Sequence, residues 1–273
     1  MCRLALHTLQ PRQLVLDVGT GSGILGIWAA RKRNCRVVCI DVSRRALRFS
    51  KANALRNSVP VAKRAEELRD GHICFLHCSF ENLVRSHKEF LQQFNIVFLN
   101  PPFNPTCAIV SPALHASAGP DAQTPFKHQI RLVPEVLKVG GYCIGYQMSY
   151  DSREGQTQVL PLIQRAYRSK CRILYAHVLQ DKKQTPVEPF LRAQYSSFLR
   201  NVKTRKNERK ELERYIKRIG GNGQFFSLIY YEVKKEHVTI RQSPREMKIR
   251  SLPQKTWTDR IWLHKCIVDH ASI

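Results

Sequence analysis

Two apolar runs about eighty residues apart constrain the fold of this chain more than any other feature. Residues 14–18 lead into a stretch with glycines at 19, 21 and 23, and residues 95–99 lead into Asn100 and two prolines. An apolar run that stops abruptly at polar, glycine or proline residues is typical of a buried parallel strand that delivers a loop to the carboxyl edge of a sheet. Because open α/β sheets bind ligands at that edge, both loops are predicted to contribute to a functional site.

Strand and helix patterns alternate over residues 14–179, which predicts a doubly wound, mainly parallel sheet. The predicted strands are 14–18, 36–41, 72–78, 94–99, 139–147 and 171–178, and the predicted helices are 23–33, 43–57, 81–93, 124–138 and 153–169. Gly140 and Gly141 are interpreted as the stop signal of the helix at 124–138. Residues 223–233 are rich in aromatic and β-branched residues and predict one further strand.

The charge of the chain indicates an anionic partner. There are 45 Lys and Arg against 21 Asp and Glu, which gives a net charge of +24 and an isoelectric point near 10.1. A nucleic acid fits this excess best, with a compositional bias of the host as the alternative. No run reaches the roughly twenty apolar residues that span a bilayer, and the N-terminus lacks the apolar core of a secretory signal. The chain is therefore expected in the cytoplasm, without a membrane partner.

Nine cysteines occur, and none forms a Cys-x-x-Cys pair. The odd count argues against a disulfide framework, and the spacing argues against a metal site, so the cysteines are predicted to be buried thiols.

A strongly basic segment separates the strand at 171–178 from the strand at 223–233. Within it, residues 202–219 fit a helix with an apolar stripe of Leu212, Tyr215, Ile216 and Ile219. The remaining positions suit contacts to phosphates, although a solvated face with internal ion pairs is the alternative. The predicted nucleic-acid contacts are Lys203, Arg205, Lys206, Arg209, Lys210, Arg214, Lys217 and Arg218.

The glycine loop suits a cofactor. Glycines let the backbone turn tightly and approach a ligand where a strand hands over to a helix. Asp17 before the first glycine can hold an amine, and Asp41, twenty residues past Gly21, can accept ribose hydroxyls. A dinucleotide cofactor is the alternative for this half of the chain. The residues predicted to bind the cofactor are Asp17, Gly19, Thr20, Gly21, Gly23, Asp41, Val42, Ser79, Phe80 and Asn100.

The second loop suits an exocyclic amine. Such an amine is a poor nucleophile because its lone pair is delocalised into a ring or carbonyl. The side-chain oxygen of Asn100 and the carbonyl oxygen of Pro101 can accept its two hydrogens, while the prolines hold these acceptors in place. The ring of Phe103 offers a face for a planar target. Asn100, Pro101, Pro102 and Phe103 are the predicted catalytic residues.

The two motifs together resemble the class I S-adenosylmethionine-dependent methyltransferases that methylate amino groups through an Asn-Pro-Pro-aromatic motif. The resemblance implies S-adenosylmethionine as the cofactor and a seven-stranded sheet whose last strand runs antiparallel beside the fifth and sixth. It also implies an acidic residue after the third strand, at a position that Ser79 occupies here. Phe80 could stack on the purine in its place.

The implied activity is methylation of an amino group of a nucleobase, most readily in ribosomal RNA. Two alternatives stay open: methylation of a glutamine in a ribosome-associated protein, and a noncatalytic RNA-binding protein on the same scaffold. The predicted domain is residues 1–233, with a basic helical insertion at about 180–222, followed by a basic extension at 234–273. The short segment before the first strand leaves room for a partner subunit that supplies substrate recognition.

Overall fold

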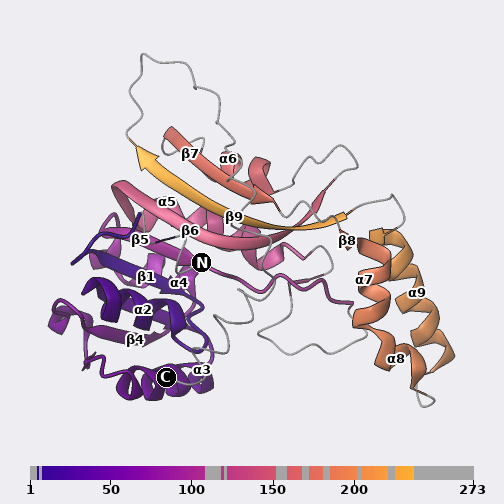
Figure 1. Ribbon diagram of the computed structural model, residues 1–273, viewed down its shortest axis with the longest axis horizontal. Helices are drawn as coiled ribbons and strands as arrows, with labels where there is room; N and C mark the ends of the chain where they lie inside the picture. The colour runs from indigo at the N-terminus through magenta and orange to yellow at the C-terminus, as the bar shows by residue number, and fades with distance from the viewer. Residues whose placement is uncertain are drawn as a thin grey trace.

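The computed structural model describes residues 5, 8–107, 118–119, 122–151, 159–167, 172–180, 185–201, 205–220 and 225–236. Within these residues nine strands form one sheet in the order β3-β4-β2-β1-β5-β6-β9-β7, with β8 paired to β9 (Figure 1). The strands are β1 Leu14–Val18, β2 Arg36–Asp41, β3 Val61–Ala62, β4 Ile73–His77, β5 Phe94–Leu99, β6 Leu137–Asp151, β7 Arg172–Gln180, β8 Thr185–Pro186 and β9 Phe225–Glu236.

The sheet has the predicted class of topology. β1, β2, β4, β5 and β6 pair in parallel, and β9 runs antiparallel to both β6 and β7 between which it lies. The prediction of seven main strands with an antiparallel last strand is confirmed, and β3 and β8 are short additions of two residues each. Three of the main strands, β1, β2 and β5, have a start and an end that agree with the predicted bounds of 14–18, 36–41 and 94–99.

Helices cover both faces of the sheet (Figure 1). They are α2 Ile24–Arg33, α3 Arg44–Arg56, α4 Phe80–Ser86, α5 Thr124–Val136, α6 Val159–Tyr167, α7 Val187–Gln194, α8 Ser196–Arg200 and α9 Lys206–Gly220, with short 3-10 turns η1 Ala65–Glu67 and η2 Lys88–Phe90. Residues 153–158 and 168–169 of the predicted helix at 153–169 lie outside the described residues, as do 223–224 of the last predicted strand.

The predicted ends of two helices are wrong. The helix expected at 81–93 ends at Ser86, because Phe90 turns inward and its ring packs 5.6 Å from the ring of Phe94 (centroid to centroid). Gly140 and Gly141 do not stop a helix, since α5 already ends at Val136. They lie in β6, where the register against β5 shifts; Gly140 has φ of 80°, and a Cβ on Gly141 would lie 2.9 Å from the backbone oxygen of Asn95.

Two hydrophobic clusters fill the space on either side of the sheet. Neighbouring residues of one strand separate cleanly: Val15 packs with residues of α2 and α3, and Leu16 packs with residues of α4, α5 and α6. This is the alternation that a strand buried on both faces requires. Full burial of a leucine or valine side chain stabilises a fold by about 1.5–3 kcal/mol, so these two clusters hold the scaffold of the site together.

A third cluster joins α7, α8 and α9, which we call the helical arm, to Cys107, Ala118 and Ala122. Figure 1 shows these helices beside one another, past β8. The predicted apolar stripe of α9 is confirmed, since Leu212 and Ile216 are fully buried, Tyr215 is 4% exposed and Ile219 is partly buried. Arg192 of α7 joins α9 by two hydrogen bonds of 3.0 Å to the carboxylate of Glu213. The arm is thus a packed unit and not a loose insertion.

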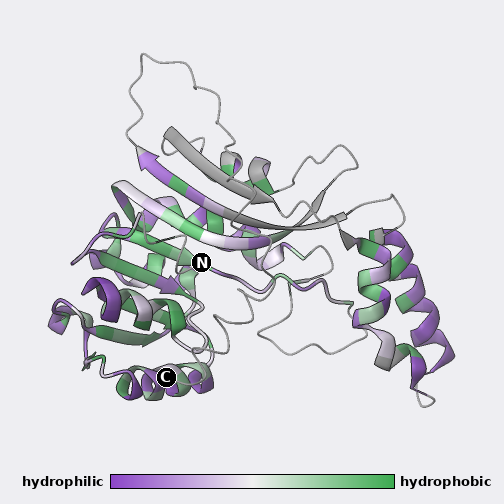
Figure 2. Ribbon diagram, in the orientation of Figure 1, coloured by the Kyte–Doolittle hydropathy of each residue, from purple (hydrophilic) through white to green (hydrophobic). Residues whose placement is uncertain are grey.

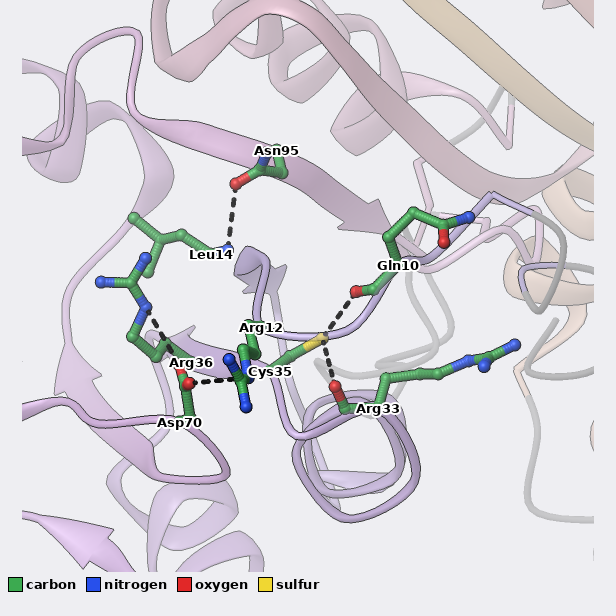
Figure 3. Close-up of polar contacts among 8 residues, drawn as sticks. All are labelled: Gln10, Arg12, Leu14, Arg33, Cys35, Arg36, Asp70 and Asn95. Atoms are coloured by element: carbon green, nitrogen blue, oxygen red, sulfur yellow. Dashed lines mark hydrogen bonds and ion pairs between the residues drawn. The ribbon is translucent and has the colours of Figure 1, made fainter.

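Polar contacts tie the strands together at the amino edge of the sheet, opposite the predicted site (Figure 3). The side-chain oxygen of Asn95 accepts a hydrogen bond of 3.1 Å from the N–H of Leu14, which fixes the starts of β5 and β1. The carboxylate of Asp70 lies 3.4 Å from the guanidinium of Arg12 and 3.9 Å from that of Arg36. Among the described helices, none is long and apolar enough to cross a membrane.

Candidate active site

The two predicted loops leave neighbouring strands at the carboxyl edge of the sheet. β1 and β5 pair in parallel with Val18 opposite Leu99, so the glycine loop and Asn100 start side by side. The chain moves from β1 to β2 on one side, whereas β5 lies on the other side of β1. Such a reversal of strand order is where sheets of this kind form a ligand crevice. The fold therefore joins two motifs that are far apart in the sequence.

The glycines of the loop serve different purposes. Gly19, Gly21 and Gly23 have φ values of 64°, 57° and 84°, a region that favours glycine. A Cβ on Gly19 would meet nothing within 4 Å, whereas a Cβ on Gly23 would lie 2.8 Å from the Cβ of Ser50 in α3. Gly19 is thus open to a ligand, and Gly23 allows α3 to approach the loop.

Asp17 lies beneath the glycine loop and is 2% exposed. Its Oδ2 atom accepts hydrogen bonds of 2.7 Å from the hydroxyl of Thr20 and 3.1 Å from the N–H of Gly26. Burial raises the pKa of Asp17 to about 6, against the opposing effect of these hydrogen bonds. The hydrogen bonds of Asp17 therefore fix the conformation of the glycine loop. Burial destabilises the ionised form of Asp17, and a nearby cation would offset this destabilisation.

Asp41 bridges the end of β2 and the glycine loop. Its Oδ2 atom accepts a hydrogen bond of 3.0 Å from the N–H of Gly21, and its Oδ1 atom accepts one of 2.8 Å from the N–H of Ser43. A carboxylate oxygen can accept a second hydrogen bond, so Asp41 still has capacity for ribose hydroxyls. The bond to Gly21 also gives a physical reason for the spacing of twenty residues between the two positions.

The other residues predicted around the cofactor lie in three different settings. Val42 is 56% exposed and offers apolar surface at the edge of the site. Ser79 caps α4, where its hydroxyl oxygen accepts a hydrogen bond of 3.1 Å from the N–H of Asn82. Phe80 is 3% exposed and packs in the core, so its ring has no free face for a purine. The structure corrects the expected stacking role of Phe80.

Residues 100–107, which we call the reaction loop, follow β5. Asn100 is exposed, and its side chain makes no hydrogen bond to another residue of the described ranges; Pro101 is buried, and Pro102 and Phe103 are partly exposed. An amide oxygen on a proline-stiffened turn, without a partner in the described part of the chain, suits the binding of an amine. Of the segment that follows this loop, residues 108–117 and 120–121 lie outside the described residues.

Tyr231 of β9 holds the start of the reaction loop. Its hydroxyl donates a hydrogen bond of 3.2 Å to the carbonyl oxygen of Leu99, directly before Asn100. Burial raises the pKa of Tyr231 well above its usual value, so the hydroxyl keeps its proton. Gly145 of β6 leaves room for this contact, because a Cβ there would overlap the Leu99 oxygen and the Tyr231 hydroxyl. Neither Gly145 nor Tyr231 belongs to a motif that the sequence makes recognisable.

Tyr195 of the helical arm holds the end of the reaction loop. Its hydroxyl donates a hydrogen bond of 2.8 Å to the carbonyl oxygen of Pro105 and accepts one of 3.1 Å from the N–H of Cys107. The side chain of Gln194 donates a further hydrogen bond of 3.1 Å to the same Pro105 oxygen. Tyr195 is 5% exposed, so both of its hydrogen bonds are shielded from water. The arm is thereby joined to the loop that carries Asn100.

The chemistry of these residues fits S-adenosylmethionine. Gly19 leaves space beside the backbone, Asp41 keeps hydrogen-bonding capacity, and Val42 presents an exposed apolar side chain. These properties match a chain with an amine, a ribose and a purine, in the same order along the edge of the sheet. Within the described ranges, no group of three or more His, Cys, Asp or Glu side chains is placed to hold a metal ion.

Comparison with solved structures identifies the class of fold. A proposed sarcosine dimethylglycine methyltransferase from Galdieria sulphuraria superposes with a TM-score of 0.50 at 13% identity, covering 86% of this chain and 84% of that one. The fold is that of the Rossmann-like methyltransferases. Residues 2–117, which contain both motifs, match the family model described as the methyltransferase small domain.

Curated relatives align over short stretches. Ribosomal protein L11 methyltransferase from Pelotomaculum thermopropionicum is 46% identical over 57 residues, which is 21% of this chain and 18% of that protein. Release factor glutamine methyltransferase from Flavobacterium psychrophilum is 31% identical over 90 residues, 33% of this chain and 26% of that one. The aligned stretches span 18% to 38% of the relatives' own length. Together these matches support an S-adenosylmethionine-dependent methyltransferase.

The raised pKa of Asp17 predicts how pH affects cofactor affinity. If Asp17 holds the ammonium group of the cofactor, as the sequence predicts, then below its pKa of about 6 a proton must be displaced from Asp17 on binding. We expect the Kd for S-adenosylmethionine to be constant above pH 7 and to rise about tenfold per unit below pH 6. Calorimetric titration between pH 5 and 8 measures this slope. The Asp17→Asn variant should bind weakly at every pH, and an equal slope in that variant would contradict the role of Asp17.

Proposed function

We propose that this protein transfers a methyl group from S-adenosylmethionine to an exocyclic amino group of a nucleobase in RNA, with ribosomal RNA the favoured substrate. The observation that carries the proposal is the position of Asn100 beside the glycine loop, directly after the matched pair of Val18 and Leu99. An amine bound to Asn100 would thereby meet the methyl group of a cofactor held at Gly19 and Asp41.

The proposed mechanism relies on acceptors and orientation. The target amine donates its two hydrogens to the Asn100 side-chain oxygen and the Pro101 carbonyl oxygen, which concentrates the lone pair on the nitrogen. S-adenosylmethionine supplies an electrophilic methyl group when it is bound. Gly19 and Asp41 would hold the cofactor, and Asn100 and Pro101 would hold the amine nitrogen toward its methyl group. On transfer the sulfur would keep the electron pair of the broken carbon–sulfur bond, and the nitrogen would release one proton to water. Preset acceptors and proximity lower the barrier without a strong base.

The helical arm supports an RNA substrate. Arg205, Lys206, Lys210, Arg214, Lys217 and Arg218 are exposed, and Arg209 is partly exposed. Figure 2 shows the hydrophobic residues of α9 toward α7 and hydrophilic residues on the outer side. Lys203 lies outside the described residues. Because Tyr195 joins the arm to the reaction loop, a polyanion bound to α9 would lie on an element that is hydrogen-bonded to the loop of Asn100.

Methylation of a glutamine side chain is the second candidate. The curated relatives include a release factor glutamine methyltransferase, and an amide nitrogen would make the same hydrogen bonds to Asn100 and Pro101. On that alternative the basic arm docks on ribosomal RNA while a protein receives the methyl group. A noncatalytic RNA-binding protein is the third candidate, which the exposed Asn100 opposes.

A labelling experiment separates these candidates. The protein is incubated with ribosomal subunits and S-adenosylmethionine that carries a tritiated methyl group, and the product is digested with ribonuclease or protease. Label that ribonuclease releases supports the nucleobase proposal, label that protease releases replaces it with the glutamine alternative, and an absence of label from folded protein rejects both.

The arm is tested in parallel with a matched pair of variants. We expect Lys210→Gln/Arg214→Gln to weaken RNA binding and to lower its dependence on log salt by about 1.5, since each lost phosphate contact changes the slope by about 0.7–0.9. Arg85→Gln/Lys88→Gln removes the same charge from exposed residues of α4 and η2 and should leave the slope unchanged. Equal effects of the two pairs would remove the arm from the proposed interface.

A further inference from the structure

Helix α3 packs against the sheet in an unusual way. Its fully buried residues are the small Ser50 and Ala54, whereas Phe49 is 54% exposed and Leu55 is 60% exposed. An amphipathic surface helix normally turns its large apolar residues toward the core. Val42, two residues before the helix, is also 56% exposed. Among these three residues Phe49 is the only aromatic one, and aromatic side chains are enriched where a protein surface meets a partner.

The same helix carries a dense positive charge. It contains no acidic residue and five basic ones, which are Arg44, Arg45, Arg48, Lys51 and Arg56. All five are exposed, and none forms an ion pair with another described residue. Two of them lie in the first turn, where the helix dipole favours anions over cations. An anionic partner would offset both the crowding of like charges and the unfavourable position of these two.

An aromatic ring lies among these cations. The guanidinium carbon of Arg45 is 5.6 Å from the centre of the Phe49 ring, one helical turn away. An exposed ring with a cation against it matches the way in which single-stranded nucleic acids are bound, where bases stack on aromatic side chains and phosphates contact basic ones. Phe49 provides the stacking face, and Arg45 and Arg48 provide the nearest positive charges.

The position of α3 connects this surface to the candidate active site. Ser43, which caps the helix, contacts Asp41, and the side chain of Asn53 donates a hydrogen bond of 2.9 Å to the carbonyl oxygen of Ser22 in the glycine loop. Figure 1 shows α3 at the edge of the molecule, well separated from the helical arm. The two basic surfaces therefore lie on different elements, both bonded to the loops of the site.

We propose that α3 is a second RNA-binding surface, on which an unpaired base stacks on Phe49 and neighbouring phosphates contact Arg45 and Arg48. The inference deepens the proposed function, because both involve RNA, but it concerns binding and not methyl transfer. A second copy of this chain suits the surface less well, because a symmetric contact would bring the five cations of each copy together. RNA supplies phosphates that can contact the basic residues and bases that can stack on Phe49.

Binding of a defined probe tests the proposal. The full chain is titrated into a fluorescein-labelled, unstructured oligouridine of 12 nucleotides, and into a hairpin duplex with the same number of phosphates. We expect Phe49→Ala to weaken oligouridine binding by about fivefold to a hundredfold, as the loss of one stacked base predicts. Phe49→Trp should restore binding, and its fluorescence should be quenched by the probe. Duplex binding should change less than twofold in either variant.

Leu55→Ala is the matched control, because Leu55 is an equally exposed apolar residue of the same helix without an aromatic ring. Equal losses in Phe49→Ala and Leu55→Ala, or no loss in either, would overturn the proposal. So would a concentration-dependent dimer that Phe49→Ala disrupts, or binding to anionic vesicles that oligouridine does not compete away. If Phe49-dependent binding persists while ribosomal subunits receive no methyl label, the proposed function fails and this inference stands. If ribosomal subunits are labelled and Phe49→Ala binds oligouridine normally, the proposed function stands and this inference fails.

Discussion

Replacement of Asn100 by alanine should abolish methyl transfer and leave the protein folded and able to bind RNA. We expect the rate constant of transfer to fall at least about a hundredfold, the usual loss when one preset hydrogen-bonding group of an active site is removed. The fold should be unaffected, because Asn100 is exposed and makes no hydrogen bond to another residue that the structure describes. Single-turnover measurements with saturating cofactor give the rate constant directly.

Two control variants give this result its meaning. Asn104→Ala changes the same type of residue four positions along the reaction loop. There the backbone carbonyl oxygen of Asn104 accepts a hydrogen bond from the N–H of Ala118, which the substitution keeps, so the rate should stay within a few fold of wild type. Asp41→Ala should instead lose calorimetric binding of S-adenosylmethionine. An Asn100→Ala protein that transfers methyl groups at the normal rate would reject the proposed site.

Among the substitutions proposed for this protein, replacement of Gly145 by alanine should cause the largest loss of stability. The added methyl group would overlap the carbonyl oxygen of Leu99 and the hydroxyl of Tyr231. The backbone cannot move away, because Gly145 of β6 is paired directly with Leu99 of the neighbouring strand β5. We expect the free energy of unfolding to fall by about 3 kcal/mol, the upper range for an overpacked core. Urea unfolding followed by circular dichroism measures this value.

Gly140 supplies the comparison, in the same strand. It has φ of 80°, but a Cβ there would meet nothing within 4 Å, so Gly140→Ala should cost about 1 kcal/mol through backbone strain. The double variant Gly145→Ala/Tyr231→Phe should recover part of the loss, because one of the two overlapping atoms is removed. If Gly145→Ala lowers the free energy of unfolding no more than Gly140→Ala does, the contact between Tyr231 and the reaction loop is not rigid.

The strands and the meeting of the two motifs were predictable because their signals are local. A buried parallel strand is an apolar run with abrupt ends, and β1, β2 and β5 carry this pattern without interruption. Once the strands are parallel, the order of the sheet brings their carboxyl ends to one edge. Asp41 could also be predicted, since its spacing from Gly21 follows from a hydrogen bond between them.

The remaining parts of the site depend on contacts that no local pattern records. Phe80 reads equally well as a stacking residue and as a core residue, and only the packing of α4 decides between them. Ser79 suits both a ligand and a helix cap, and the geometry of the first turn of α4 shows the cap. Tyr195 and Tyr231 lie in stretches that look like ordinary core, since a buried hydroxyl is recognised only by its partner.

The two tyrosines that hold the reaction loop affect the order in which the site can form during synthesis. The contacts around the glycine loop involve residues of β1, β2 and α3, all within the first 53 residues, so they can assemble early on a growing chain. The contact from Tyr195 spans 90 residues and that from Tyr231 spans 132. An unfinished chain can thus gain a cofactor pocket well before it gains a fixed Asn100. On the proposed function, we expect methyl transfer only after β9 has left the ribosome and paired with β6 and β7.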